Sequence, residues 1–284
     1  MIRLKDVSYV YMQGGPFEKT ALDNINLEIN DGEFIGIIGH TGSGKSTLIQ
    51  LLNGLLKPTS GSIEIAGYTL TDKKTRLRDV RFDVGLVMQY PEYQLFEETV
   101  FKDIAFGPKN MGLDEDEIKS RVEFAANIVG LPPELLEKSP FDLSGGQMRR
   151  AAIAGVLAME PKVLILDEPT AGLDPGGRDE ILYKIKDMHE RMNMTVLLVS
   201  HSMEDVAKLA DRILVMNGGR KEMFDTPSKV FEKAERLSEI GLNVPQVTRV
   251  ADGLRKLGMP LRSGIYTIND AVYCIADALR GDNL

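Results

Sequence analysis

The stretch GHTGSGKS, residues 39–46, matches the pattern G-x-x-x-x-G-K-[ST]. It lies between an apolar run expected to be a buried strand and an apolar stretch expected to be a helix. Glycines in such a loop let the backbone N–H groups wrap a phosphate chain, and the following helix N-terminus adds partial positive charge. Lys45 is expected to neutralise the β- and γ-phosphates and Ser46 to bind Mg²⁺. The predicted ATP-binding residues of this loop are Gly39, Thr41, Gly42, Ser43, Gly44, Lys45, Ser46 and Thr47.

Apolar runs on both sides of this loop predict a parallel sheet covered by helices. Runs typical of strands buried on both faces occur at residues 34–38, 84–88, 163–166 and 196–199, and a fifth at 213–216 is expected to join them. Helical periodicity is expected between them, at residues 115–129, 146–158 and 178–192. This order predicts an α/β fold. Alternating segments at residues 2–11, 22–29 and 62–65 predict an additional antiparallel β subdomain.

A small, mostly helical C-terminal domain is expected after Pro227. Residues 228–240, 245–257 and 269–279 have amphipathic helical patterns and are separated by glycine and proline. The last of them is predicted to place Val272, Ile275, Ala276 and Leu279 on one face. The predicted domains are residues 1–226, a nucleotide-binding domain with a helical subdomain at about 90–160, and residues 227–284, a helical dimerisation domain.

The run at 163–166 ends in two acids, Asp167 and Glu168. In P-loop enzymes an aspartate at the end of such a strand holds the Mg²⁺, so Asp167 is a predicted metal ligand. Glu168 is placed to polarise a water for in-line attack on the γ-phosphate and is a predicted catalytic residue. Two acidic residues at the end of a strand are often only a solvated part of the sheet edge, with no catalytic role. The phosphate-binding loop on the same chain favours the catalytic interpretation.

A second phosphate-binding device lies upstream of this acidic strand. Ser144-Gly145-Gly146-Gln147 opens a predicted helix, and N–H groups at a helix N-terminus attract anions. One ATP cannot occupy both devices within one subunit. We therefore expect a dimer in which Ser144, Gly145, Gly146 and Gln147 of each chain close on the ATP of its partner.

With Leu143 before it, this device resembles the LSGGQ signature of ABC transporter nucleotide-binding domains. The resemblance covers roughly residues 1–226 and implies further roles. Gln89 resembles the Q-loop glutamine, which touches metal and water, and His201 resembles the switch histidine, which contacts the γ-phosphate. Asp174 closes a segment at 171–174 that resembles the D-loop, which crosses the dimer interface. Tyr11 fits the aromatic residue that stacks on adenine, although Tyr9 is close by.

Several segments narrow the resemblance to energy-coupling factor transporter ATPases: residues 89–100, 103–108 and 169–175, and an insertion at 14–18 that suits the second of two ATPase types. The resemblance implies an ATPase, peripheral on the cytoplasmic face of the cell membrane, that powers uptake of a vitamin or transition metal ion. It implies three kinds of partner: a second ABC ATPase (a related chain or itself), a membrane coupling subunit, and small substrate-binding membrane subunits. It also implies that Glu92, Glu97 and Glu98 meet basic residues of the coupling subunit, with Leu95 and Phe96 as an apolar anchor.

Composition excludes several other classes of protein. A net charge of −8 and a pI near 5.1 argue against nucleic acid as the main partner. The single cysteine, Cys274, is expected to be an apolar helix residue, and it fits a reducing compartment. No run approaches the roughly 20 apolar residues that span a bilayer, and the opening residues are predicted as a strand rather than a signal peptide. Any membrane role is therefore expected to be peripheral.

Three alternatives remain at this point. The chain could serve a conventional importer that uses a soluble binding protein. It could be a non-transport ABC protein that acts on DNA or ribosomes, although it has neither the long coiled-coil insertion nor the second ATPase domain usual in those proteins. The C-terminal domain could be a regulatory ligand sensor, but no phosphate loop, metal cluster or pair of catalytic acids follows residue 230, which favours dimer contact. The sequence leaves the transported substrate open, and also the choice between a homodimer and a heterodimer.

Overall fold

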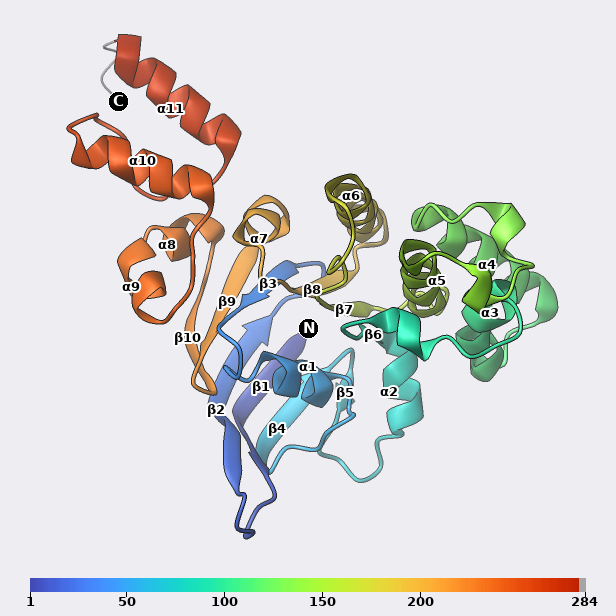
Figure 1. Ribbon diagram of the computed structural model, residues 1–284. Coiled ribbons are helices and arrows are strands. Elements are labelled where there is room, and N and C mark those ends of the chain that lie inside the picture. Colours follow the sequence, from blue (N-terminus) through green and yellow to red (C-terminus); the bar gives the residue numbers. More distant parts are fainter. Residues whose placement is uncertain (281–284) are drawn as a thin grey trace.

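The computed structural model describes residues 1–280, so the last four residues of the predicted C-terminal domain lie outside it. Its centre is a six-stranded sheet with strand order β10-β9-β3-β8-β7-β6 (Figure 1). The strands are β3 (Phe34–Ile38), β6 (Val84–Val87), β7 (Val163–Asp167), β8 (Thr195–Val199), β9 (Arg212–Asn217) and β10 (Arg220–Asp225). Strands β3, β6, β7, β8 and β9 run parallel, whereas β10 pairs antiparallel with β9. The five predicted runs therefore form the parallel part, as expected.

Alternate residues of the central strands face two different cores. Leu164 and Leu166 of β7 pack toward α5 (Gly145–Leu157) and α6 (Pro175–Met192). Val163 and Ile165 belong to the other core, which contains α1 (Lys45–Leu52). Both faces of these strands are covered, so their sequences are apolar throughout instead of alternating.

A second, antiparallel sheet shares the core with α1. Its order is β2-β1-β4-β5, formed by β1 (Ile2–Tyr11), β2 (Lys19–Ile29), β4 (Ser60–Ile65) and β5 (Tyr68–Thr69). The pairings between β1 and β2 and between β1 and β4 are antiparallel, as predicted. Ile2 and Val7 of β1 lie in one cluster with Leu48 and Leu52 of α1. This packing fixes the helix that follows the phosphate-binding loop.

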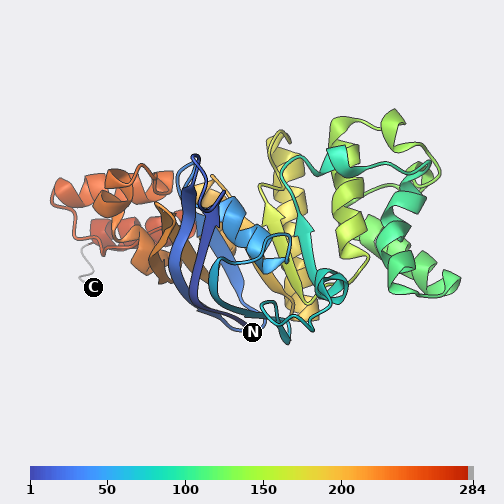
Figure 2. The ribbon, with the colours of Figure 1, turned by 90° about the horizontal axis from the view of Figure 1, so that it is seen from below.

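A group of helices lies beyond the β6 edge of the central sheet (Figures 1 and 2). It consists of α3 (Val100–Met111), α4 (Glu115–Ile128) and α5, and α2 (Leu77–Asp83) leads from β5 into β6. Short 3-10 turns at Pro91–Gln94, Pro133–Leu135 and Pro140–Asp142 connect the helices. Asp114 caps α4, and Ser144 forms a capping box with Gln147 at the start of α5.

The C-terminal helices lie at the opposite end of the molecule from α3–α5 (Figures 1 and 2). They are α8 (Pro227–Phe231), α9 (Ala234–Glu239), α10 (Gln246–Lys256) and α11 (Ile268–Arg280). The single helix expected at 228–240 is wrong, because the backbone leaves helical geometry at Lys233, where ψ is 43°. The resulting turn lets Phe231 and Leu237 both pack against α7 (Met203–Leu209) and β9.

The predicted apolar face of α11 is only partly buried. Val272 and Leu279 are 59% and 72% exposed, whereas Ala271 and Cys274 are buried. The small side chains of α11 pack closely against Ala251 and its neighbours on α10, so the buried face of α11 is the face that carries small side chains. Of the larger apolar residues of the predicted face, Ile275 packs partly against this core, whereas Val272 and Leu279 are left on the surface. Within residues 1–280, no helix is both long enough and apolar enough to cross a bilayer.

Candidate nucleotide-binding site

The loop at 39–44 (the P-loop) follows β3 and leads into α1. Gly42 and Gly44 have φ of 81° and 101°, a region that side-chain-bearing residues rarely adopt. A Cβ on Gly44 would also lie 2.7 Å from the Ala21 carbonyl oxygen. Within the loop, Ser43 is fully buried, and a Cβ on Gly39 would lie 2.4 Å from the Ser43 Oγ. Glycine is therefore required where the backbone must both turn and approach its neighbours.

Lys45 turns its ammonium group back into the loop. Its Nζ donates hydrogen bonds to the carbonyl oxygens of Gly39 at 2.7 Å and His40 at 3.1 Å. Burial lowers the pKa of Lys45, although the negative charges of Glu168 and Asp167 oppose this shift. The ammonium is thus held by neutral oxygens and faces two carboxylates, an arrangement suited to binding an anion.

Asp167 ends β7 and points into the same cavity. Burial raises its pKa to about 6, and the charge of Glu168 adds to the shift, while Lys45 and His201 oppose it. Burying a carboxylate disfavours its charged form unless a cation compensates. Asp167 therefore carries an unfavourable charge at neutral pH, and a bound metal cation would offset that cost.

Glu168 stands at the centre of a cluster of three side chains. Its Oε1 lies 2.9 Å from His201 Nε2, and its Oε2 accepts a hydrogen bond of 3.4 Å from Gln89 Nε2. These residues follow β7, β8 and β6, whose carboxyl ends meet at one edge of the parallel sheet. The backbone of Glu168 has φ of 49°, an uncommon conformation for a residue other than glycine. Three motifs that are far apart in sequence thus converge on one carboxylate.

Tyr11 stands at the wall of the cavity. Its hydroxyl lies 3.1 Å from Thr47 Oγ1, and its ring meets that of Tyr9 edge to face at 4.8 Å. The cavity has a volume of about 340 Å³. It is lined by Tyr11, Lys19, Ala21, Thr41, Gly42, Gly44, Lys45, Ser46, Thr47, Gln89, Asp167, Glu168 and His201. The sequence prediction missed Lys19 and Ala21, because they belong to β2 and no motif marks them.

The predicted signature residues lie outside this cavity. Ser144 Oγ accepts from Gln147 N, and Gln147 Oε1 accepts from Ser144 N, so both side chains cap α5. A Cβ on Gly145 would meet nothing within 4 Å, and one on Gly146 would meet only Leu173, at 3.6 Å. The glycines therefore present an open backbone surface.

The predicted D-loop adjoins this surface. Asp174 caps α6 and accepts a hydrogen bond from Gly177 N at 2.9 Å. Leu173, beside it, is the residue that approaches Gly146. The structure thus brings the signature and the D-loop together, and neither lines the cavity formed by the P-loop of the same chain.

The predicted docking segment needs two corrections. Glu92 is not a free surface charge, because it pairs bidentately with the guanidinium of Arg149. Leu95 is packed in the core of the helical part and lines the groove beside Phe96, so it does not project from the surface. Phe96 is 59% exposed and meets Phe106 edge to face, at the side of a groove of about 290 Å³. Glu98 is exposed and pairs with Lys102.

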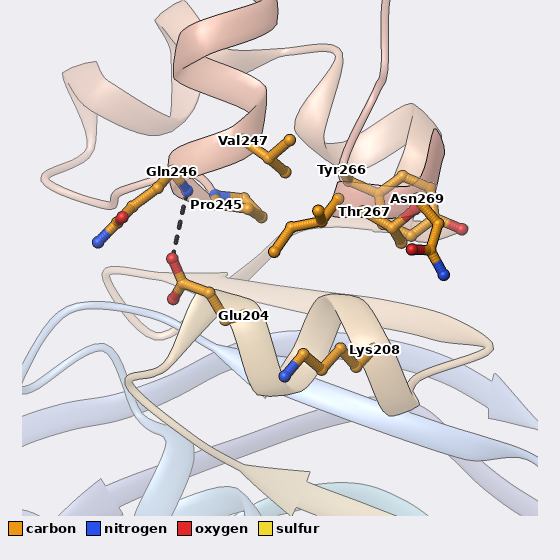
Figure 3. Close-up of a pocket in the computed structure, with 9 residues that line it drawn as sticks. Glu204, Lys208, Pro245, Gln246, Val247, Tyr266, Thr267 and Asn269 are labelled. Atoms are coloured by element: carbon orange, nitrogen blue, oxygen red, sulfur yellow. Dashed lines mark hydrogen bonds between the residues drawn. The ribbon is translucent and has the colours of Figure 1, made fainter. Parts of the chain in front are cut away.

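Another cavity, of about 660 Å³, lies between α7 and the C-terminal helices (Figure 3). Pro245, Val247 and Tyr266 face Glu204 and Lys208 of α7 across it (Figure 3). Glu204 Oε1 accepts from Gln246 N at 3.2 Å, which ties α10 to α7. Among residues 1–280, no group of three or more His, Cys, Asp or Glu side chains could hold a metal ion by itself.

Comparison with known proteins places the chain among transport ATPases. The family model described as ABC transporter matches residues 22–171. The energy-coupling factor transporter ATP-binding protein EcfA2 of Caldanaerobacter subterraneus subsp. tengcongensis is 61% identical, covering 99% of this chain and 98% of that protein. The protein of the same name from Clostridium perfringens (strain 13 / Type A) is 56% identical, covering 99% of each.

Solved structures agree with these sequence matches. The cbiO1 protein of Clostridium perfringens, described as part of the ABC transporter complex cbiONQ, matches with a TM-score of 0.74 and 38% identity, over 89% of this chain and 98% of that one. The ATP-binding cassette MJ0796, in a dimeric post-hydrolysis state bound to ADP and Pi, matches with a TM-score of 0.73 and 30% identity, over 80% of this chain and 98% of that one. The chain belongs to the ABC transporter family and, within it, to the energy-coupling factor transporter ATP-binding proteins.

Proposed function

We propose that this chain binds and hydrolyses ATP on the cytoplasmic face of the cell membrane and thereby powers uptake of a vitamin or transition metal ion. The observation that carries this proposal is the convergence of Lys45, Asp167, Glu168, Gln89 and His201 on one cavity beside the P-loop. The alternative of a conventional importer has less support, because relatives at 61% and 56% identity bear the energy-coupling factor name.

The P-loop holds the β- and γ-phosphates through its N–H groups and Lys45, and Tyr11 stacks on the adenine. Ser46, Gln89 and Asp167 would hold a Mg²⁺ ion together with the phosphates, and this ion would supply positive charge to offset the negative charge that develops during phosphoryl transfer. The site suits this ion, because Mg²⁺ takes one or two carboxylates together with phosphates rather than an all-protein cage. The raised pKa of Asp167 supports the same assignment.

Glu168 accepts the proton of the attacking water, and His201 and Gln89 orient Glu168 through the contacts that they already make. Catalysis of this type comes mostly from positioning and electrostatic stabilisation. Both carboxylate oxygens of Glu168 are partnered in this way, so the side chain is held in place.

The complete ATP site is shared by two chains. Ser144, Gly145, Gly146 and Gln147 of one chain close on the γ-phosphate held by the partner's P-loop, and Asp174 lies at the same interface. The open backbone at Gly145 and the absence of these residues from their own chain's cavity support this arrangement. The dimeric form of MJ0796 supports it by analogy. The second chain is a related ATPase or another copy of this one.

The membrane coupling subunit docks at the groove beside Phe96. Phe96 and Phe106 provide an apolar contact, and Glu97 and Glu98 provide negative charge for basic helices of that subunit. Such rim charges act on encounter and orientation more than on affinity. The small substrate-binding membrane subunits select the cargo.

The C-terminal residues 227–284 serve dimer contact. The exposed Val272 and Leu279 of α11 support this role, because apolar side chains exposed on one helix are typical of contact surfaces. The cavity between α7 and α10 favours a second candidate, a regulatory ligand site. Both roles are compatible with the ATPase activity.

Affinity purification of the tagged chain from its native membranes, with mass spectrometry of the copurifying chains, tests the proposal. We expect a second ABC ATPase, a coupling membrane protein and small substrate-binding membrane proteins. Recovery of a conventional permease with a soluble binding protein would be consistent with the ATPase chemistry but would contradict the proposed type of uptake system. Recovery of ribosomes or DNA-repair proteins without membrane subunits would contradict transport.

A further inference from the structure

Arg149 on α5 is a buried cation that the proposed chemistry does not use. Its side chain is 4% exposed, and it pairs bidentately with Glu92, with Nε–Oε2 at 3.1 Å and Nη2–Oε1 at 2.9 Å. Glu92 lies in the short turn Pro91–Gln94, directly after Gln89. Arg149 therefore fastens the segment after Gln89 (the Q-loop) to the helix that starts with the signature residues.

One nitrogen of this guanidinium, Nη1, has no hydrogen-bond partner. Nη1 is fully enclosed and makes no hydrogen bond within the described chain. A buried donor without an acceptor is costly, and native structures usually satisfy such groups. Nη1 can gain a hydrogen bond only if an acceptor from a neighbouring segment moves toward it.

The D-loop lies beside this unpartnered nitrogen. A Cβ built on Gly172 would lie 3.9 Å from Arg149 Nη1 and meets no other atom within 4 Å. Gly172 has φ of 79° and precedes Leu173, which approaches the signature at Gly146. The backbone of the D-loop therefore lies beside Nη1.

The other contact of Arg149 leads toward the catalytic cluster. Its guanidinium carbon lies 5.9 Å from the centre of the Tyr90 ring. Tyr90 follows Gln89 and has φ of 58°, an uncommon conformation that needs support from its surroundings. Arg149 thus contacts Tyr90 and Glu92, which follow Gln89 closely in the chain.

We propose that Arg149 is a positioning residue for ATP hydrolysis, which links the D-loop to the Q-loop. Closure of the ATP-bound dimer brings a D-loop carbonyl near Gly172 to Nη1. With that bond made, the guanidinium is fully satisfied and holds Tyr90, Glu92 and hence Gln89 in the hydrolytic arrangement. The inference rests on the shared ATP site proposed above.

Arg149→Lys is the discriminating substitution. Lysine keeps the positive charge beside Glu92, but it lacks the planar fork that reaches both Glu92 and the D-loop. We expect kcat of the assembled transporter complex to fall about tenfold, equivalent to ~1.4 kcal/mol, because the lost charge-assisted bond forms only in the closed state. KM for ATP should change less than about twofold, because Arg149 lies outside the nucleotide cavity.

The matched control is Arg121→Lys. Arg121 lies in the same helical part and pairs with Glu117 and Glu160, but it touches neither the Q-loop nor the D-loop. We expect this variant to keep the parental kcat. Thermal melting without nucleotide is measured for both variants, to separate a structural effect from a positioning effect.

Parental kcat in Arg149→Lys would overturn the inference, as would an equal loss of kcat in Arg121→Lys. A lower melting temperature of Arg149→Lys with loss of ATP binding would also overturn it, because Arg149 would then be a structural residue only. If the parental complex itself hydrolyses no ATP, the proposed function fails instead. The two failures are thereby distinguished.

Discussion

Replacing Asp167 by asparagine should stabilise the nucleotide-free chain at neutral pH while removing its response to Mg²⁺-ATP. Burial, together with the charge of Glu168, raises the pKa of Asp167 to about 6 from its ordinary value of 3.8. Between these two values the folded chain binds more protons at this group than the unfolded chain does. The free energy of unfolding therefore falls as pH rises from about 4 to about 6, and the full cost of the ionised carboxylate is present above that window.

The shift of about 2.2 pKa units corresponds to ~3 kcal/mol as an upper bound. Asp167 is only partly shielded from water, so we expect Asp167→Asn to gain about 1–2 kcal/mol at pH 7.5. For a chain of this size that gain raises the melting temperature by about 2–4 °C. With Mg²⁺-ATP the order should reverse, because the variant lacks a predicted metal ligand.

Thermal melts between pH 4 and 8, with and without Mg²⁺-ATP, measure both effects. The control is Asp187→Asn, which removes an exposed carboxylate paired with Arg191 and should change the melting temperature little. The stabilisation by Asp167→Asn should disappear toward pH 4. A variant less stable than the parent at neutral pH without nucleotide, or a gain that does not depend on pH, would refute the reasoning.

Two further substitutions test other parts of the site. Lys45→Ala should lower the affinity for ATP at least about tenfold, because it removes the charge-assisted contacts to the phosphates; titration with a labelled nucleotide measures this, and unchanged binding would contradict the P-loop assignment. Glu97→Lys combined with Glu98→Lys should impair copurification with the membrane coupling subunit while ATP binding is kept, since both residues directly follow Phe96 in the chain and neither lines the nucleotide cavity. Normal copurification of the double variant would contradict a docking role for Glu97 and Glu98.

Residues that are close in sequence, or that end buried strands, could be predicted well. Phe34–Ile38 and Val163–Asp167 are apolar because both of their faces are covered, and their carboxyl ends carry the P-loop and the acids. Strand β10 was not predictable in this way. Its sequence RKEMFD has no apolar run, and it is a strand because its backbone pairs with the edge of β9.

Features that depend on distant contacts escaped prediction. The sequence gives no sign that Arg149 is buried, because its partner Glu92 lies 57 positions earlier in the chain. For the same reason Glu92 resembled a surface charge. On α11, periodicity predicted one apolar face that includes Val272 and Leu279, and only the packing against α10 decides that Ala271 and Cys274 face inward.

The most direct test of the shared ATP site is the association state of the Glu168→Gln variant. The variant is purified as the full-length chain, and its association is measured by light scattering, both alone and mixed with its copurified ATPase partner. This variant keeps the nucleotide cavity but removes the proposed base, so Mg²⁺-ATP should convert it to a stable dimer. Adding Ser144→Arg should abolish the dimer and leave ATP binding intact, because Ser144 lies outside the chain's own cavity. An ATP-dependent dimer that tolerates Ser144→Arg, or no ATP-dependent dimer in either preparation, would contradict the account.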